Sequence, residues 1–214
     1  MPTIYGDVQS GNCYKIKLLL NLLKLPHRWH FIDIMQNQTR TPEFLAKNPN
    51  GKVPLLELDD GRLLSESNAI INFLAEGSAY FPNDPWLRAQ VLQWQFFEQY
   101  EHEPTVAVAR FIVKFQGTPA ERQQELKIKQ ANAHKALRVM EQHLQAHDYF
   151  VDNRLTNADI SLYAYTHVAH EGDVSLDAYP AIRRWLQRVS QTAGFISIAE
   201  AEKTQRTGHQ GSSP

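Results

Sequence analysis

Cysteine is nearly absent from this chain of 214 residues, which carries one, Cys13. A single cysteine excludes a structural disulfide within the chain, and secreted proteins more often carry paired cysteines. Net charge is also small, at -1, so the chain has no strong field for gathering nucleic acid phosphates or an acidic membrane surface. These features predict a cytoplasmic protein without a nucleic acid partner.

Long hydrophobic runs and a secretion signal are lacking as well. The longest apolar runs, such as 18–20, are far too short to span a bilayer, and residues 1–5 show no leader pattern. Hydrophobic residues nevertheless make up 43% of the chain and charged residues 21%, as in ordinary globular proteins. We therefore expect a folded protein without membrane contact, in one large domain or two unequal ones.

The first part of the chain alternates between strand and helix patterns. The predicted elements are a strand over 2–6, a helix over 13–24, a strand over 28–34, one or two helical turns near 42–45, strands over 53–58 and 62–64, and a helix from 66. Lys15 and Lys17 fall on the polar side of the first helix, which Pro26 ends. This order predicts a βαβ unit with parallel strands, followed by ββα.

After Gly77 the pattern becomes helical almost throughout. Candidate helices cover 86–100, 104–115, 119–147, 156–170 and 180–191. Thr156 and Asp159 have the spacing of a capping box at a helix start. We expect an α/β domain over 1–78, a linker over 79–85, an all-helical domain over 86–203 and a disordered polar tail over 204–214.

Four segments resemble, in their order and spacing, the motifs of a known protein family. They are Ser-Gly-Asn-Cys-Tyr-Lys at 10–15, Asn-Pro-Asn-Gly-Lys-Val-Pro at 48–54, Leu-Ser-Glu-Ser-Asn-Ala-Ile at 64–70 and Thr-Asn-Ala-Asp-Ile at 156–160. Together they make the chain similar to the glutathione transferases along nearly its whole length. The resemblance implies a thioredoxin-like α/β domain that binds glutathione, a C-terminal helical bundle domain, a cleft between them, and a homodimer.

The Ser-x-Asn-x-x-Lys pattern that begins at Ser10 is similar to that of bacterial nu-class transferases, and a serine in this place also resembles the theta and zeta classes. A free thiol has a pKa of about 8.5, so such an enzyme must favour the ionised sulfur. A hydroxyl donor at the positive end of a helix can do so. The resemblance gives this catalytic role to Ser10 and, jointly, Asn12. Taken alone, either residue is more often a simple helix cap.

The resemblance assigns the remaining glutathione contacts to the other segments. It implies a cis peptide bond between Val53 and Pro54, which turns the main chain of Val53 toward the ligand's cysteinyl residue. Ser67 and Glu66, at a helix start, are expected to bind the γ-glutamyl end, and Lys52 to pair with the glycyl carboxylate. Ordinary capping, a proline at a strand entry and a surface lysine are the alternatives for these residues.

Several other residues leave alternatives open. Thr39 lies where relatives often have His or Gln at the glycyl end, and the adjacent Arg40 is a substitute. Cys13, in the first helical turn, is a candidate nucleophile, but the resemblance places it three residues after the cysteine position of other classes. Tyr5 matches a tyrosine that is catalytic in other classes of the family, but in serine-type members this tyrosine stands away from the sulfur, so we assign it no role. Among the nine histidines no metal-binding pattern is found, so we expect no metal.

Three functions follow from these observations. The first is transfer of the glutathione thiolate to an electrophile, with Arg110 as a candidate contact from the helical domain. The second is glutathione-dependent disulfide reduction, in which two bound glutathiones carry the electrons. The third is a binding or scaffold protein that has kept the fold without turnover.

Overall fold

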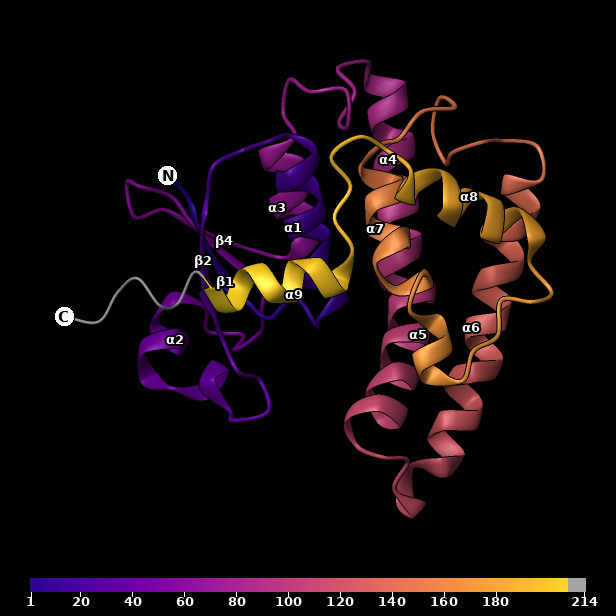
Figure 1. Ribbon diagram of the computed structural model, residues 1–214, viewed down its shortest axis with the longest axis horizontal. Helices are drawn as coiled ribbons and strands as arrows, with labels where there is room; N and C mark the ends of the chain where they lie inside the picture. The colour runs from indigo at the N-terminus through magenta and orange to yellow at the C-terminus, as the bar shows by residue number, and fades with distance from the viewer. Residues whose placement is uncertain (208–214) are drawn as a thin grey trace. The chain divides into compact units, whose positions relative to one another are not determined.

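The N-terminal elements form one four-stranded sheet with helices in the computed structural model, which describes residues 1–207 (Figure 1). They are β1 (Thr3–Gly6), α1 (Gly11–Leu22), β2 (Arg28–Phe31), α2 (Pro42–Lys47), β3 (Leu55–Glu57), β4 (Leu63–Ser65) and α3 (Ser67–Leu74). The strand order is β2-β1-β3-β4, in which β1 and β2 are parallel and the other neighbours antiparallel. This arrangement confirms the predicted thioredoxin-like βαβ-ββα order.

The register of the sheet brings four strand ends to one edge. Tyr5 pairs with Leu55, and Leu55 pairs with Ser65, so β1 ends where β3 begins and β4 ends. Strand β2 is parallel to β1 and ends at the same edge, with Phe31 opposite Gly6. The segments that continue from these ends contain every residue predicted to hold glutathione.

Helix α1 is buried on nearly all sides, which differs from the predicted amphipathic helix. Lys15 is 0% exposed and Lys17 is 8% exposed. The prediction that both lysines lie on an exposed polar face was wrong. Hydrophobic periodicity within one helix does not show which distant segments will pack against its polar side. The helix ends as expected before Pro26, with Lys24 at φ 53 and the N–H of Leu25 bonded to the Leu20 carbonyl at 2.9 Å.

One added layer, on the side of α1 that bears Tyr14 and Asn21, comes from the C-terminal end of the described chain, which includes helix α9 (Ile198–Thr207). The Tyr14 hydroxyl donates to the Ile196 carbonyl at 2.7 Å, and Asn21 Nδ2 donates to the Gly194 carbonyl at 2.8 Å. Gln205 accepts the main-chain N–H of Val8 at 3.0 Å. These bonds fasten residues near the end of the chain to residues near its beginning.

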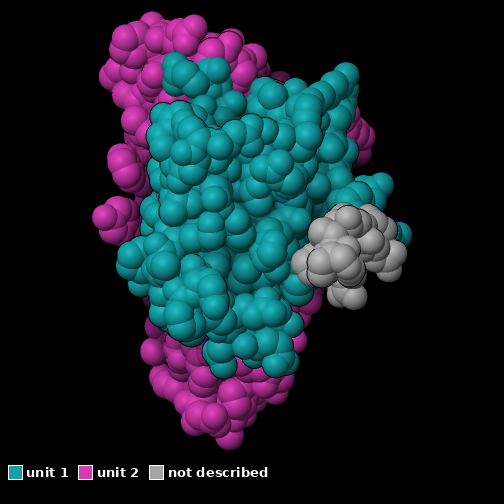
Figure 2. All heavy atoms as spheres, turned by 90° about the vertical axis from the view of Figure 1, so that its left-hand side faces the viewer, with its two compact units in different colours: residues 1–76, 192–214 teal, residues 77–191 magenta. Residues whose placement is uncertain are grey.

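The chain accordingly forms two compact units, coloured separately in Figure 2. One unit comprises Met1–Glu76 with the segment from Thr192 onward, and the other comprises Gly77–Gln191. The segment 192–203 had been assigned to the helical domain, and residues 204–207, assigned to the polar tail, continue helix α9. The rest of that tail, residues 208–214, lies outside the described residues.

The second unit is helical, as predicted. Its main helices are α4 (Pro85–Phe97), α5 (Glu103–Arg110), α6 (Gln123–Leu144), α7 (Asn157–Thr166) and α8 (Pro180–Ser190). The predicted break before Pro104 is absent, because a wider π-helical segment, Glu98–His102, joins α4 directly to α5 (Figure 1). The Thr105 hydroxyl donates to the Glu101 and His102 carbonyls at 3.0 and 2.8 Å, which helps the helix continue past a proline that lacks an N–H.

The capping box at the start of α7 is confirmed. The Thr156 N–H donates to Asp159 Oδ2 at 2.9 Å, and the Thr156 side chain accepts from the helix. Asp159 Oδ1 also accepts from the Phe150 N–H at 3.1 Å and from Trp185 Nε1 at 3.0 Å. Since Asp159 is fully buried, this carboxylate joins the start of α7 to α8 in the core of the helical unit.

Candidate functional site

Ser10 lies directly ahead of helix α1, at the sheet edge described above. Its carbonyl accepts the N–H groups of Cys13 and Tyr14 at 3.0 and 2.9 Å, as expected at a helix start. Its side chain, however, makes no capping hydrogen bond to the helix and instead contacts the Cys13 thiol. Simple capping therefore does not account for the hydroxyl of Ser10.

A buried lysine connects the starts of α1 and α3. Lys15 Nζ donates to Asn12 Oδ1 at 2.9 Å and to Ser67 Oγ at 3.3 Å, and Ser67 Oγ donates to Asn12 Oδ1 at 3.2 Å. We call these three residues the lysine cluster. The structure thus brings together two predicted site residues, Asn12 and Ser67, through a third residue to which the sequence analysis gave no role. The signal was present, since Lys15 completes the Ser-x-Asn-x-x-Lys pattern.

The junction between β4 and α3 has an unusual backbone. Glu66, a non-glycine residue, has φ 70 and ψ 113 and is exposed, whereas the next residue, Ser67, is only 5% exposed. A positive φ at a residue with a Cβ costs free energy and is found preferentially at functional sites. This conformation places an exposed carboxylate and a buried hydroxyl side by side at the beginning of a helix.

The turn that enters β3 contains the predicted cis bond, between Val53 and Pro54, and so confirms it. Asn48, which is 5% exposed, organises this turn by donating from Nδ2 to the Lys52 carbonyl at 2.7 Å and accepting the Asn50 N–H at 3.2 Å. Sequence reasoning marked Asn48 only as part of a turn. Within the described residues, the main-chain N–H and C=O of Val53 form no hydrogen bond, so this main chain can pair with a ligand.

Thr39 and Arg40 differ in their access to solvent. Thr39 is 6% exposed within a short helical turn, Gln38–Arg40, while the side chain of Arg40 is exposed. Arg40 Nη1 lies 3.5 Å from the Asn50 carbonyl, which joins this turn to the one that precedes β3. Lys52 in that second turn is exposed as well. The accessible cations near this turn are therefore Arg40 and Lys52.

Cys13 is fully buried, and its burial raises the pKa of the thiol to about 12. The thiol is therefore protonated at neutral pH and is a poor nucleophile. Its sulfur also lies against Gly6, where an added Cβ would come within 2.6 Å of Cys13 Sγ. The side chain points into the first unit.

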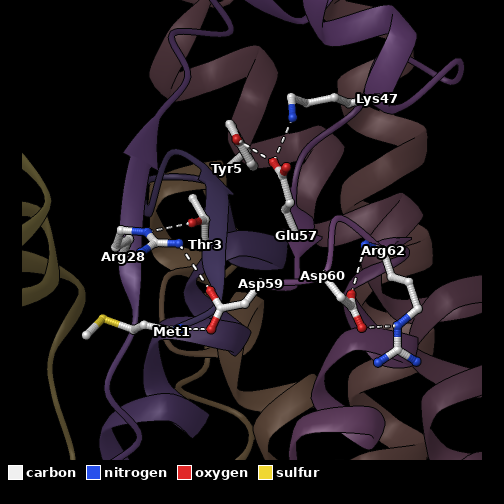
Figure 3. Close-up of polar contacts among 9 residues, drawn as sticks. All are labelled: Met1, Thr3, Tyr5, Arg28, Lys47, Glu57, Asp59, Asp60 and Arg62. Atoms are coloured by element: carbon white, nitrogen blue, oxygen red, sulfur yellow. Dashed lines mark hydrogen bonds and ion pairs between the residues drawn. The ribbon is translucent and has the colours of Figure 1, made fainter.

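The Tyr5 side chain lies beside Glu57, which also contacts Lys47 of α2 (Figure 3). Its hydroxyl donates to Glu57 Oε2 at 2.6 Å, and Lys47 Nζ lies 2.7 Å from the same oxygen. Burial, and then the Glu57 carboxylate, raise the pKa of Tyr5. A hollow of ≈ 470 Å³ beside it is lined by Tyr5, His30, Phe31, Ile32, Gln38, Thr41, Glu43, Phe44 and Lys47. This lining includes Gln38 and Thr41, which flank Thr39 and Arg40, but none of the residues predicted to bind glutathione.

In the helical unit, Arg110 is an internal ion-pair partner. It is 2% exposed, and its Nε lies 2.5 Å from Glu171 Oε2, which also pairs with Lys114 through the second oxygen. His143 and His147, four residues apart in the sequence, stack on each other with their ring centroids 4.3 Å apart. Within residues 1–207 no group of three or more His, Cys, Asp or Glu side chains could hold a metal ion.

No helix in this part of the chain is long and apolar enough to cross a membrane.

Comparisons with known proteins agree with this geometry. The N-terminal domain model of the glutathione S-transferases matches residues 9–76, and the C-terminal domain model matches residues 94–192. A crystal structure of a glutathione S-transferase from Pseudomonas fluorescens is 55% identical, with a TM-score of 0.91 over 92% of this chain and 98% of that one. A possible glutathione S-transferase from Rhodopseudomonas palustris is 46% identical, with a TM-score of 0.90 over 92% and 90%.

A curated relative extends the same likeness to a fungal protein. The glutathione S-transferase-like protein LUC7 of a Fusarium species is 30% identical over 205 residues, which cover 88% of each chain. The family models together span both compact units, and the bacterial structures match nearly the whole fold. The chain therefore belongs to the glutathione S-transferase family.

Proposed function

We propose that this protein is a glutathione transferase, which binds glutathione at the common edge of the sheet and activates its thiol for attack on an electrophilic substrate. One observation carries the proposal: the register gathers the start of α1, the entry to β3 and the start of α3 at that edge. The start of α1 offers a hydroxyl, the entry to β3 offers the main chain of Val53, and the start of α3 offers a helix N-terminus. These groups suit the sulfur, the cysteinyl main chain and the γ-glutamyl carboxylate of the tripeptide.

The sulfur lies, in this proposal, at the start of α1. Lowering a thiol pKa by about two units takes about 2.7 kcal/mol of preferential interaction with the thiolate. The Ser10 hydroxyl is suited to supply part of it, because it makes no capping bond and stands at the positive end of a helix. Asn12, in the first turn of the same helix, supplies amide donors. Both are proposed catalytic residues.

The two ends of the tripeptide bind on either side of the sulfur. Ser67, at the start of α3, receives the γ-glutamyl carboxylate, and the exposed Glu66 carboxylate receives the amino group. The main chain of Val53, beside Pro54, pairs with the cysteinyl residue as an added strand does. Lys52 takes the glycyl carboxylate. Arg40 assists it in preference to Thr39, because the threonine side chain is buried.

The proposed reaction is nucleophilic transfer. The glutathione thiol loses its proton to solvent, the thiolate forms a carbon–sulfur bond with the electrophile, and the leaving group departs with its electron pair. In the alternative reaction, two glutathiones reduce one disulfide to two thiols and leave as oxidised glutathione. Cys13 takes no part in either reaction, because its buried thiol stays protonated.

The test is calorimetric titration with reduced and with oxidised glutathione, beside assays with a model aryl halide and a model disulfide. Binding of reduced glutathione with turnover of the halide supports the proposal. Binding of the oxidised form with turnover of the disulfide alone identifies the reductase, and binding without turnover of either identifies a binding protein. No affinity for either form of glutathione would overturn the whole assignment.

We also propose a homodimer, on the evidence of exposed apolar side chains in both units. Leu63 and Phe73 are 40% and 48% exposed in the first unit, and Trp86, Phe96 and Tyr100 are 71%, 61% and 77% exposed in the second. Side chains of this kind are commonly covered by a partner. Sedimentation equilibrium should give twice the chain mass, and a monomer mass at micromolar concentration contradicts the dimer.

The buried free thiol fits a reducing cytoplasm.

A further inference from the structure

Helix α1 holds two buried lysines two residues apart, and their surroundings differ. Lys17 is 8% exposed, and its Nζ lies 3.1 Å from His27 Nε2 and 5.5 Å from the centre of the Trp29 ring. Lys15 is 0% exposed and bonds to Asn12 and Ser67. A fully buried ammonium is costly unless it is hydrogen-bonded, so its position calls for a role that an apolar side chain would not fill.

The chemistry of the lysine cluster fixes the orientation of Asn12. An ammonium group donates and never accepts, so the carboxamide must turn its oxygen, Oδ1, toward Lys15. Ser67 Oγ donates to the same oxygen at 3.2 Å, which strengthens this choice. The N–H donors of Asn12 then point away from Lys15 and Ser67. Removing the ammonium takes away its hydrogen bond to Oδ1 and so weakens this orientation of the carboxamide.

We propose that Lys15 is a positioning residue of the glutathione site, which holds the Asn12 donors toward the sulfur and the Ser67 hydroxyl at the γ-glutamyl end. This inference rests on the proposed function. It links two parts of the ligand through one side chain that touches neither. The effect of Lys15 is therefore expected both on ionisation of the bound thiol and on affinity for the part of glutathione that has no thiol.

The positive charge of Lys15 favours the thiolate form of the bound sulfur, as its hydrogen bonds do by holding Asn12. Charged groups of the first unit at this edge include the carboxylates of Asp7, which acts on Cys13, and of Glu66, at the start of α3. Both are negative and disfavour a thiolate, as Asp7 does for Cys13, while Lys15 favours it. Arg40 and Lys52 are assigned to the other end of the ligand. Lys15 thus supplies the positive charge on the α1 side.

The experiment compares Lys15→Met with Lys17→Met, a matched removal of a buried lysine from the same helix. Ultraviolet difference absorbance of bound glutathione against pH gives the thiol pKa, and calorimetry with S-methylglutathione gives affinity without an ionisable thiol. In Lys15→Met we expect the thiol pKa to rise by about one unit and the affinity for S-methylglutathione to fall about tenfold. Lys17→Met should leave both values as in the wild type.

A second variant keeps the inference testable if Lys15→Met does not fold. Lys15→Gln retains N–H donors for Asn12 and Ser67 without the charge, so it should hold S-methylglutathione within about threefold of the wild type and still raise the thiol pKa. Folded Lys15 variants with the wild-type pH profile would overturn the positioning role while leaving the proposed function intact. Wild-type protein that binds no glutathione overturns the proposed function itself.

Discussion

Helices α1 and α7 each follow a residue with a hydroxyl side chain, and these two hydroxyls are used in opposite ways. At α7, Thr156 forms a capping box with Asp159, which is buried and bonded to Trp185. At α1, Ser10 makes no capping bond and stays half-buried at the edge of the sheet. A helix start that satisfies its own groups serves stability, whereas one whose hydroxyl caps no main-chain group can turn that hydroxyl to a ligand. Substitutions at the two starts should therefore separate stability from activity.

The largest expected effect is on stability, at α7. Asp159→Ala removes the acceptor for several buried donors, so we expect the free energy of unfolding to fall by about 4 kcal/mol. Chemical denaturation measures this loss. Activity per folded molecule should be unchanged at low temperature, since Asp159 lies in the other unit from the proposed site. A stability loss below about 1 kcal/mol would refute the central role of this carboxylate.

The same carboxylate should make stability depend on pH. Burial raises the pKa of Asp159 to about 6, against an ordinary value of 3.8. A raised pKa means that the folded state holds the proton more tightly, so this contribution is present at low pH and is lost as the pH rises through about 6. Relative to Asp159→Asn, the wild type should lose up to about 3 kcal/mol between pH 4 and pH 7 in urea unfolding. A constant difference across that range would contradict the shift.

At α1 the expected effect is on rate. Ser10→Ala should lower kcat/KM about 100-fold, equivalent to about 2.7 kcal/mol of transition-state stabilisation, and change the unfolding free energy by less than about 0.5 kcal/mol. Thr156→Ala is the matched control, with a stability loss of about 1 kcal/mol and no loss of rate. Equal activity of Ser10→Ala and wild type would remove Ser10 from its proposed role. If Ser10→Ala and Thr156→Ala lowered the unfolding free energy equally, the proposed difference between the two helix starts would be refuted.

The smallest effect is expected at Cys13, which contacts Ser10 from inside the first unit. Cys13→Ala should keep kcat/KM within about threefold of the wild type, because a protonated thiol is not the nucleophile. The lost packing should cost about 1 kcal/mol in denaturation. An inactive Cys13→Ala variant that remains fully folded would show instead that the Cys13 sulfur, rather than the glutathione sulfur, is the nucleophile.

Local signals in the sequence predicted much of the fold and the order of the candidate site. The alternation of strands and helices, the hairpin at 59–61 and the capping box depend on neighbouring residues, so a single sequence contains them. The cis bond before Pro54 followed from the resemblance and is confirmed. The structure places Ser10, Asn12, Val53 and Ser67 along one edge or its continuing segments, although their proposed roles remain to be tested.

The features that the sequence did not predict depend on distant residues. Lys15 was predicted to lie on a polar face because no neighbouring residue indicates that the start of α3 will pack beside it. Pro104 suggested a break between helices, but a π-helical segment and the Thr105 hydroxyl compensate for its missing N–H. The positive φ of Glu66 is equally hidden, since it follows from how β4 meets α3. In each case tertiary packing overrides a local preference.

The return of the C-terminal segment to the start of the chain has a consequence for biosynthesis. Gln205 bonds to Val8 and Asp7, and Ile196 receives the Tyr14 hydroxyl, on both sides of the turn that carries Ser10. During synthesis the turn that carries Ser10 therefore lacks these supports until residues 196–205 have been made, so this part of the first unit is completed only after the helical unit, residues 77–191, has been translated.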